Sequence, residues 1–562
     1  MNKGDEESEK GDYIHVIRTQ ALGRPFRLGM LYDRVHDTII PGETVLTMAD
    51  MEKHIYKKKK NGCSFDVIYG DSLEDKSRVF NGDVNLQRNS LFGIVSLGSS
   101  GKFLKSKISS KKQLRVTLTA EYIMMYKELE MKQFQSLISN TKTNATHIVT
   151  AIEYGTNVAF TFDRTISDKE NELEVRGELN GMMKFIPGLF KASAKAELGM
   201  KHIDMQKADN ISCKFYGDII LPVNPTTYEE AVRVYKELPS YLKEDEAVPV
   251  TVWLYPITKG VRPTKKVSQL INKEKMKQAI IALDDLQRIY VSCNDLMSGQ
   301  AVMHVPEVQD KIDQFRRAVQ TYQEEFQDLV LDELLKDDES SNNKMSRWLV
   351  MIGNMQHWIS QTIEIEMNLL NIYIKEIKEE QIEILHKSGV DAKLFKHDHV
   401  IILDIVLPFS SGQYVNKEPG TSAHFTTQQQ ESSVNQSVSS MQTPGRHDTS
   451  TSAEGNSWYS DPNIKAYVRK NIKRLVTLNS TKNRHFNCFV TFTDCIVPHR
   501  KVSSCIHVVS YEDGKETKEI DLFSIEDEKM LSTSLEDVRK ESGIDRHSRK
   551  AFRSRSGNPR KS

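Results

Sequence analysis

The chain has 562 residues, of which 38% are hydrophobic and 27% are charged, a composition typical of a soluble globular protein with about three or four domains. Lysine plus arginine and aspartate plus glutamate number 77 each, so net charge gives no general attraction to nucleic acid or anionic lipid. The charged start MNKGDEESEKGD predicts no signal peptide, and no stretch reaches the roughly 18 apolar residues that a spanning helix needs.

Cysteine usage indicates a reducing compartment. Six cysteines are scattered through the chain: Cys63, Cys213, Cys293, Cys488, Cys495 and Cys505. Such wide spacing in a large chain favours reduced thiols over a disulfide framework. We therefore expect a cytoplasmic protein, with any release from the cell by a non-classical route.

Residues 1–12 are predicted to be a disordered tail, and residues 13–259 are predicted to form a mainly β domain. Strand candidates alternate polar and apolar residues or run apolar, and several end at glycine turns. They are FDVIYG (65–70), LRVTLTAEYIMMY (114–126), ATHIVTAIEYG (145–155), VAFTFD (158–163), CKFYGDIILPV (213–223) and VPVTVWLYPI (248–257). One helix is expected after Thr227, which is placed to form a capping box with Glu230.

Residues 260–394 are predicted to form an antiparallel helical bundle. Apolar residues recur at alternating intervals of four and three over residues 308–329, which is typical of a coiled-coil-like seam. A similar stripe covers residues 276–293. Met345–His386 is predicted to be helical, with Leu385 on its apolar face.

Residues 395–526 are predicted to form an α/β domain, which opens with the buried strand HVIILDIVLPF (399–409). A tract rich in serine, threonine and glutamine, residues 410–459, interrupts this domain and is expected to be disordered. A helix and the strands HFNCFVTF and CIHVVSYEDGKE follow. Residues 527–562 are predicted to be a helix and a basic disordered tail.

Four blocks of the first domain carry a family resemblance. They are RTQALGRPFRLGMLYDRVHDTIIPG (18–42), THIVTAIEYGTNVAFTFDR (146–164), CKFYGDIILPVNPTTYEEAVRVYKELPSYL (213–242) and VPVTVWLYPI (248–257). In this order they resemble the stonustoxin-like family, which contains two-subunit fish venom cytolysins and their non-venom relatives. The resemblance implies the fold of the perforin and cholesterol-dependent-cytolysin (MACPF/CDC) superfamily, a bent and twisted sheet flanked by two helical clusters.

The same resemblance implies an α+β multidomain chain. The sheet domain would be followed by a bundle like the focal-adhesion-targeting domain and by a degenerate thioredoxin-like domain. Tyr154, Gly155 and Thr156 match the start of a superfamily signature, whereas Asn157 replaces its histidine. The thioredoxin-like domain has no Cys-x-x-Cys pair, so we expect it to be structural. We also expect the chain to lack the PRY-SPRY module with which family members usually end.

No motif points to an enzyme, a cofactor or a bound metal. LGSSGKF (97–103) lacks the first glycine and the final serine or threonine of a phosphate loop, so a flexible glycine turn is the preferred interpretation. Near the C-terminus lie His485, Cys488, Cys495, His499, Cys505 and His507. Their spacing fits no common zinc site, and buried thiols are the preferred interpretation. We expect neither a small-molecule substrate nor nucleic acid as a partner.

In pore-forming members of the superfamily, two helical clusters refold into amphipathic hairpins that enter the membrane. By position these clusters are residues 73–112 and 167–208. The candidate insertion residues are Leu91, Phe92, Ile94, Val95, Leu97, Leu173, Val175, Leu179, Ala192, Ala194, Ala196 and Leu198. Their alternation in the second cluster is typical of a strand with one lipid-facing side. The same cluster also suits a helix packed on the sheet through Met182, Met183 and Ile186, which is the favoured alternative.

Basic segments allow three interpretations. Lys57–Lys60 could attract anionic lipid, act as a nuclear signal or lie in a solvated loop, and the solvated loop is favoured. The basic C-terminal tail allows the same three.

Two functions remain open. The first is a pore-forming or membrane-perturbing protein, which would oligomerise with itself or with a related subunit and unfurl its helical clusters in a lipid membrane. The second is a cytosolic, non-lytic scaffold that uses the same domains to bind a protein partner.

Overall fold

The computed structural model describes much of the chain in two compact units. The units are Met1–Asn294 with Val319–Gly353, and Asp295–Ala318 with Asn354–Ser562. The described residues are 16–34, 36–44, 52–80, 83–91, 98–130, 145–188, 208, 210–257, 273–334, 339–386, 389–390, 393, 396, 399–409, 457–480, 487–494, 504–512 and 515–522. Each unit has its own sheet.

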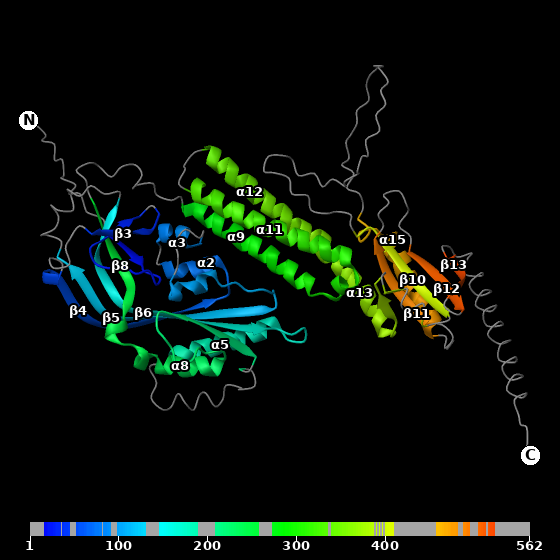
Figure 1. Cartoon of the computed structure of the whole chain (residues 1–562), viewed down its shortest axis with the longest axis horizontal. Helices are drawn as coiled ribbons and strands as arrows, with labels where there is room; N and C mark the ends of the chain where they lie inside the picture. Colours follow the sequence, from blue (N-terminus) through cyan, green and yellow to red (C-terminus); the bar gives the residue numbers. More distant parts are fainter. Residues whose placement is uncertain are drawn as a thin grey trace, which may run out of the picture. The chain divides into compact units, whose positions relative to one another are not determined.

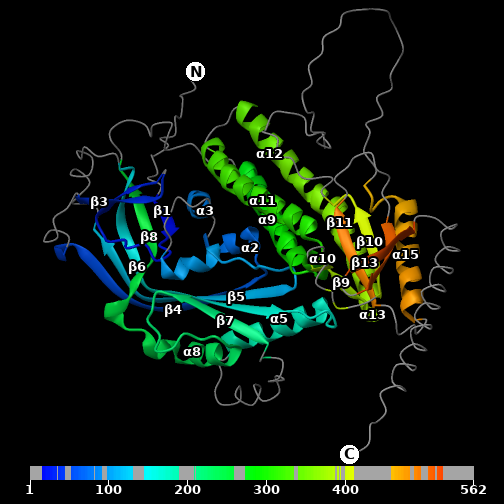
Figure 2. The same cartoon turned by 45° about the vertical axis from the view of Figure 1, so that its right-hand side comes forward.

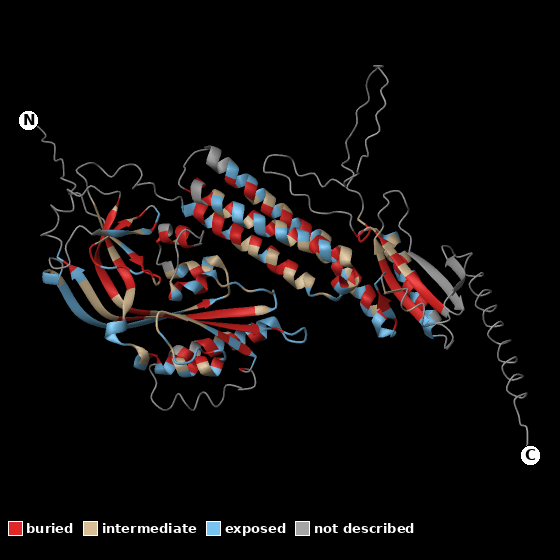
Figure 3. Ribbon diagram, viewed as in Figure 1, coloured by how far each residue is buried: buried red, intermediate tan, exposed pale blue. Residues whose placement is uncertain are grey.

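The first unit is built on an eight-stranded antiparallel sheet (Figure 1). Its strands are β1 (Ile17–Gln20), β2 (Met30–Asp33), β3 (Thr38–Thr44), β4 (Ile55–Tyr69), β5 (Gln113–Leu129), β6 (His147–Thr165), β7 (Ile211–Gly217) and β8 (Val248–Pro256). The long central strand β6 pairs with β5 and β2 on one side and with β7 and β8 on the other. Among the described strands, β4 pairs with β5 alone and forms an edge. Figure 3 shows that this edge strand is largely exposed, whereas β6 is largely buried.

Short helices lie on the two faces of this sheet (Figures 1 and 2). One face carries the first helical region, which comprises α2 (Leu73–Lys76), η1 (Ser77–Phe80), α3 (Val84–Leu91) and η2 (Ser99–Lys105). The other face carries α5 (Glu172–Gly188) and α8 (Tyr228–Tyr241), and the short turn η4 (Glu244–Glu246) follows α8. Neighbouring residues of β6 lie on opposite faces of the sheet. Phe160 packs with α5 and α8, whereas Ala159 packs with η2.

The start of α8 has the predicted capping box. Thr227 Oγ1 accepts the backbone N–H of Glu230 at 3.2 Å, and the Glu230 carboxylate accepts the N–H of Thr227 at 3.3 Å. The buried face of α8 contains Ala231, Tyr235 and Leu238, which cover the sheet.

A buried polar network joins β1, the β2–β3 turn and α3. Tyr32 Oη donates to Asp37 at 2.5 Å, and Thr19 Oγ1 donates to Asp83 at 2.5 Å. Arg34 pairs with both carboxylates. Burial and Asp37 raise the pKa of Tyr32 although nearby guanidinium groups oppose the change, so this phenol stays a donor.

His147, at the start of β6, lies close to this network and predicts a pH dependence of stability. Burial and the Arg34 charge lower its pKa from 6.5 to about 4. Between these values the unfolded state binds a proton that the folded state does not, so stability is lost as the pH falls from 6.5 towards 4. We expect wild type to lose about 2 to 3 kcal/mol more than His147→Gln between pH 7.5 and 4.5, measured by urea unfolding. Equal losses in both proteins would contradict this assignment.

Between β8 and β9 (Glu383–Leu385) the described residues form five helices and a π-helical turn. They are α9 (Lys273–Met297), α10 (Gln300–His304), α11 (Pro306–Glu333), α12 (Glu339–Trp358), the turn η5 (Ile359–Ile363) and α13 (Glu364–Glu379). The division between the two units falls within α9, α11 and α12. In the first unit Tyr322 of α11 packs on Trp348 of α12 at 4.3 Å between ring centroids. In the second unit Phe315 packs on Trp358 at 4.2 Å. None of the described helices combines the length and hydropathy needed to cross a bilayer.

The apolar seam of α11 is confirmed, except at its end. Its buried residues are Val308, Ile312, Phe315, Val319, Tyr322, Phe326 and Val330. Val330 thus occupies the buried position predicted for Leu329, which is only half-buried.

The prediction that Met345–His386 is helical throughout is wrong at its C-terminal end. The chain reverses at Gln381, whose φ is +58°, and Leu385 pairs with Thr491 in a sheet.

The second unit contains a five-stranded mixed sheet in the order β13-β12-β10-β11-β9. Its strands are β9 (Glu383–Leu385), β10 (His399–Leu407), β11 (Asn487–Asp494), β12 (Ser504–Glu512) and β13 (Lys515–Leu522). The parallel pair β10–β11 is connected through α15 (Pro462–Ser480), while β12 and β13 are antiparallel. This arrangement gives an α/β unit, and its likeness to thioredoxin stays a prediction.

The residues on either side of the long segment between β10 and α15 meet in the core of the second unit. Phe409 contacts Trp458 edge to face, with ring centroids 6.1 Å apart, and both are buried. Trp458 Nε1 donates to Glu366 at 2.9 Å, and Lys311 Nζ pairs with the other carboxylate oxygen at 2.9 Å. Trp458 therefore belongs to the core, although the sequence places it inside the insertion; residues 410–456 lie outside the described part.

Candidate functional site: the bend of the sheet and the helix that covers it

The long strands change register together at one level of the first sheet. Between β5 and β6 the register changes from Ile123–Gly155 to Met125–Tyr154, which leaves Met124 as an extra residue. The β4–β5 pairing shifts between Lys59 and Gly62, and the β6–β8 pairing shifts beside Tyr154. Because a bulge bends and twists its strand, three bulges at one level bend the sheet, as Figure 1 shows for β4, β5 and β6.

Gly155 lies at this bend, where its neighbours leave no room for a side chain. A Cβ atom on Gly155 would lie 1.8 Å from the carbonyl oxygen and 2.8 Å from the carbonyl carbon of Tyr122. These are backbone atoms of the bulged strand, so they cannot move aside as a side chain could. The adjacent signature residues differ in burial: Thr156 is buried, and Tyr154 is half-buried with Lys127 4.6 Å from its ring centroid. The superfamily-like signature thus marks the bend.

Charged groups gather beside the bend. Glu153 has a nearly buried side chain that pairs with Lys60 from β4 and lies 3.6 Å from Arg18 of β1. Burial and the Glu153 charge raise the pKa of Glu121, on the adjacent strand.

Lys57–Lys60 are exposed, as the favoured interpretation expected, but they belong to strand β4 and not to a loop. Lys59 and Lys60 already pair with Glu244 and Glu153.

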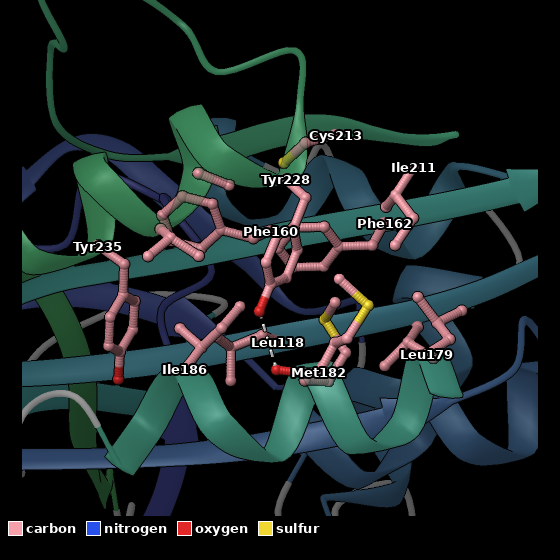
Figure 4. Packing of buried hydrophobic residues seen from close by; sticks show 14 of the residues in the cluster. Leu118, Phe160, Phe162, Leu179, Met182, Ile186, Ile211, Cys213, Tyr228 and Tyr235 are labelled. Carbon is pink, nitrogen blue, oxygen red and sulfur yellow. Dashed lines mark hydrogen bonds between the residues drawn. The ribbon is translucent and has the colours of Figure 1, made fainter. Parts of the chain in front are cut away.

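The second predicted insertion segment is helical from Glu172 to Gly188 in this structure. Its buried residues are Val175, Leu179, Met182, Met183 and Ile186, which follow helical spacing and pack on β5 and β6 (Figure 4). Tyr228 Oη of α8 donates to the Met182 carbonyl at 3.1 Å. The favoured alternative, a helix packed on the sheet, is therefore the arrangement seen.

Leu173 and Leu179 provide a matched test of this packing. Leu173 is 78% exposed and Leu179 is 1% exposed, although both belong to the predicted alternating set. We expect Leu179→Ala to reduce the free energy of unfolding by about 3 kcal/mol, because it opens a cavity in the core, and Leu173→Ala to change it by less than about 0.5 kcal/mol. Thermal and urea unfolding measure both; equal effects would contradict the helical packing.

The structure describes only one of the remaining predicted insertion residues. Leu91 is the last residue of α3, while the other residues of the first set and Ala192, Ala194, Ala196 and Leu198 lie outside the described part.

The glycine turn of LGSSGKF is tightly packed, since Gly98 donates its N–H to the Leu22 carbonyl at 2.9 Å and its backbone meets Gly23. The residues after Gly98 form η2, and the flexibility expected of this turn stays a prediction.

The cysteine and histidine set is spread over separate strands. Cys488 is buried on β11, and burial raises its pKa to about 11. Cys505 and His507 lie on β12, opposite Asp404 and Ile402 of β10. His485, Cys495 and His499 lie outside the described residues. Within the part of the chain that the structure describes, no group of histidine, cysteine and carboxylate side chains could hold a metal ion.

Comparison with known proteins places this geometry in a family. The sequence model described as "SNTX, MACPF/CDC-like domain" matches residues 16–240, and the "Stonustoxin helical domain" matches residues 281–349. Stonustoxin subunit beta of Synanceia horrida is 30% identical over 398 residues, covering 68% of this chain and 56% of that protein. The chain belongs to the stonustoxin-like family. Neoverrucotoxin subunit alpha of Synanceia verrucosa is 31% identical over 357 residues, covering 59% of this chain and 51% of that protein.

A solved stonustoxin structure has the same fold. It superposes with a TM-score of 0.65 at 23% sequence identity, covering 91% of this chain and 70% of that one. The bent antiparallel sheet with its helical regions is therefore the MACPF/CDC-like fold of the stonustoxin-like family. The chain spans about half the length of the curated relatives it matches, with 56% and 51% of the two named above covered.

Sequence reasoning missed the bulges that accompany Gly155. The run EYIMMY (121–126) has three successive apolar residues, Ile123–Met125, whereas strict alternation would interrupt them with a polar residue. Such a break in the two-residue period is the signal of a bulge. It could have located Met124, and with it the bend, before the structure was known.

Proposed function

We propose that this chain is a membrane-perturbing, pore-forming protein whose two helical regions leave the sheet and insert into lipid. The observation that carries the proposal is the bent sheet with a glycine at its bend and separate helical regions on its two faces. A spanning strand needs roughly 9–11 residues, fewer than the 17 residues of α5. Extension of α5 would therefore supply enough chain to cross a bilayer.

Assembly is proposed to use the edge of the sheet. β4 is 15 residues long and lies at an edge among the described strands, and an unpaired edge can add a strand from another molecule. A related chain is a suitable partner, because the named relatives are alpha and beta subunits. The helical bundle and the second unit, interpreted as focal-adhesion-targeting-like and thioredoxin-like, would act as structural supports.

Dye release from liposomes tests the proposed function. Purified full-length protein is added to vesicles of varied sterol and anionic lipid content, alone and with a related subunit. We expect release in at least one lipid mixture. No release in any mixture by folded protein, with a stable complex recovered with a non-membrane protein partner, would favour the scaffold function.

A further inference from the structure

Among the described residues, the first helical region shares a smaller apolar core with the sheet than α5 and α8 do. Its core comprises Leu22, Ile68, Leu86, Phe103, Leu104 and Ala159, whereas the core beneath α5 and α8 is more than three times as large. Near the ends of the region, the sheet face is polar, with Thr117 Oγ1 3.2 Å from Thr161 Oγ1 and Arg115 paired to Asp163. Because apolar burial is the main source of cohesion, a small described core gives the polar contacts of this region a larger share in holding it.

Ion pairs join the two ends of the region to each other. Asp71 accepts from Lys76 at 2.6 Å and from Arg115 at 2.9 Å, and it also accepts the N–H of Ile108 at 2.8 Å. Lys76 Nζ donates in addition to the Ser106 carbonyl at 2.6 Å. The side chains of Lys76 and Arg115 are almost fully buried. The chain entering the region and the chain leaving it therefore meet at one place.

Helix α9 crosses that place and bonds to both chain segments. Asp284 accepts the backbone N–H of Leu73 at 2.9 and 3.2 Å. Three residues later, Gln287 Nε2 donates to the Ile108 carbonyl at 3.4 Å, and seven residues beyond that Asn294 Nδ2 donates to the Ser109 carbonyl at 3.3 Å. Intervals of three and seven residues place the three side chains on one face of the helix. All of these residues belong to the first unit.

These contacts join backbone groups at the two ends of the first helical region to side chains of a single helix. We propose that α9 is a strap, formed by Asp284, Gln287 and Asn294, that keeps the first helical region on the sheet until α9 moves away. The consequence for membrane insertion rests on the proposed function, but the strap itself is a property of the protein in solution. The three bonds named above go to the region on this face of the sheet, and the strap is proposed to act there.

Amide hydrogen exchange of the full chain in solution, without lipid, tests the strap directly. The test variant carries Asp284→Ala, Gln287→Ala and Asn294→Ala. The control is Asp285→Ala, which removes a neighbouring carboxylate that pairs with Arg288 on the same helix. We expect the amides of α2 and η2 to exchange about tenfold faster in the test variant, since it loses one hydrogen bond to a carboxylate and two from neutral amides, and to be unchanged in the control. Unchanged exchange in the test variant would overturn the proposal.

A milder variant and a second readout separate the possible failures. Asp284→Asn keeps the shape of the side chain and removes its charge; if the triple variant does not fold, this variant has to show a smaller rise of exchange at Leu73 and Glu74. Dye release is measured in parallel. Faster exchange with faster release supports both the strap and the proposed function. Faster exchange without release from any vesicle supports the strap and contradicts the proposed function.

Discussion

Replacing Gly155 by alanine is expected to prevent the sheet from forming its bend. The added methyl group would lie 1.8 Å from the Tyr122 carbonyl oxygen and 3.1 Å from the Ile123 Cα. Only a separation of β5 from β6 could relieve this overlap, at a cost of about 3 kcal/mol or more. We expect a large fall in the thermal midpoint of the first unit, or insoluble protein.

Gly177 provides the matched control. It lies on the exposed side of α5, and a Cβ atom added there would meet nothing within 4 Å. Gly177→Ala should therefore stabilise the helix by about 0.5 to 1 kcal/mol, because alanine loses less conformational entropy in a helix than glycine does. Circular dichroism on heating measures both variants. A Gly155→Ala protein as stable as wild type would show that the strands do not approach as closely as described.

A disulfide between α5 and the sheet is expected to abolish dye release. Ile186 of α5 and Leu118 of β5 belong to the same buried core, in which α5 packs on β5 (Figure 4). Ile186→Cys with Leu118→Cys, once oxidised, would tie the helix to the strand beneath it. Because insertion as proposed requires α5 to leave the sheet, the tethered protein cannot release dye while its fold is retained.

Reduction of the same protein is the control for the two substitutions. Addition of a reducing agent should restore release to the level of the untethered chain, and each single cysteine variant should release dye under oxidising conditions. Full release by the oxidised pair, with the disulfide verified by mass spectrometry, would show that α5 stays on the sheet during the activity. The proposed insertion of the second region would then be wrong.

The elements with a strong repeating pattern were predictable from sequence. The seam of α11 and the capping box at Thr227 follow from local spacing, and the structure has both. The alternating set around Leu173 left two alternatives open, because Val175 and Leu179 fit both a two-residue period and a helical one. Only the packing of Met182, Met183 and Ile186 on the sheet distinguishes the two.

Features that depend on distant residues were not predictable in the same way. Leu385 has an apolar position in a helical pattern, yet its backbone is paired with β11, which lies about a hundred residues further along the chain. Likewise, nothing local to Asp284 indicates that its carboxylate accepts the N–H of Leu73. The superfamily-like signature identified Gly155, but the reason for a glycine lies in the bulged strand opposite it.

The contact between Phe409 and Trp458 has a consequence for how this chain could diversify. Because the two residues on either side of the serine- and glutamine-rich segment meet in the core, the distance between its ends is fixed whatever the segment contains. Lengthening a closed loop changes its entropy only slowly. The position therefore works as a cassette site, at which natural variation, a reporter or a fused domain can be exchanged while the second unit keeps its stability.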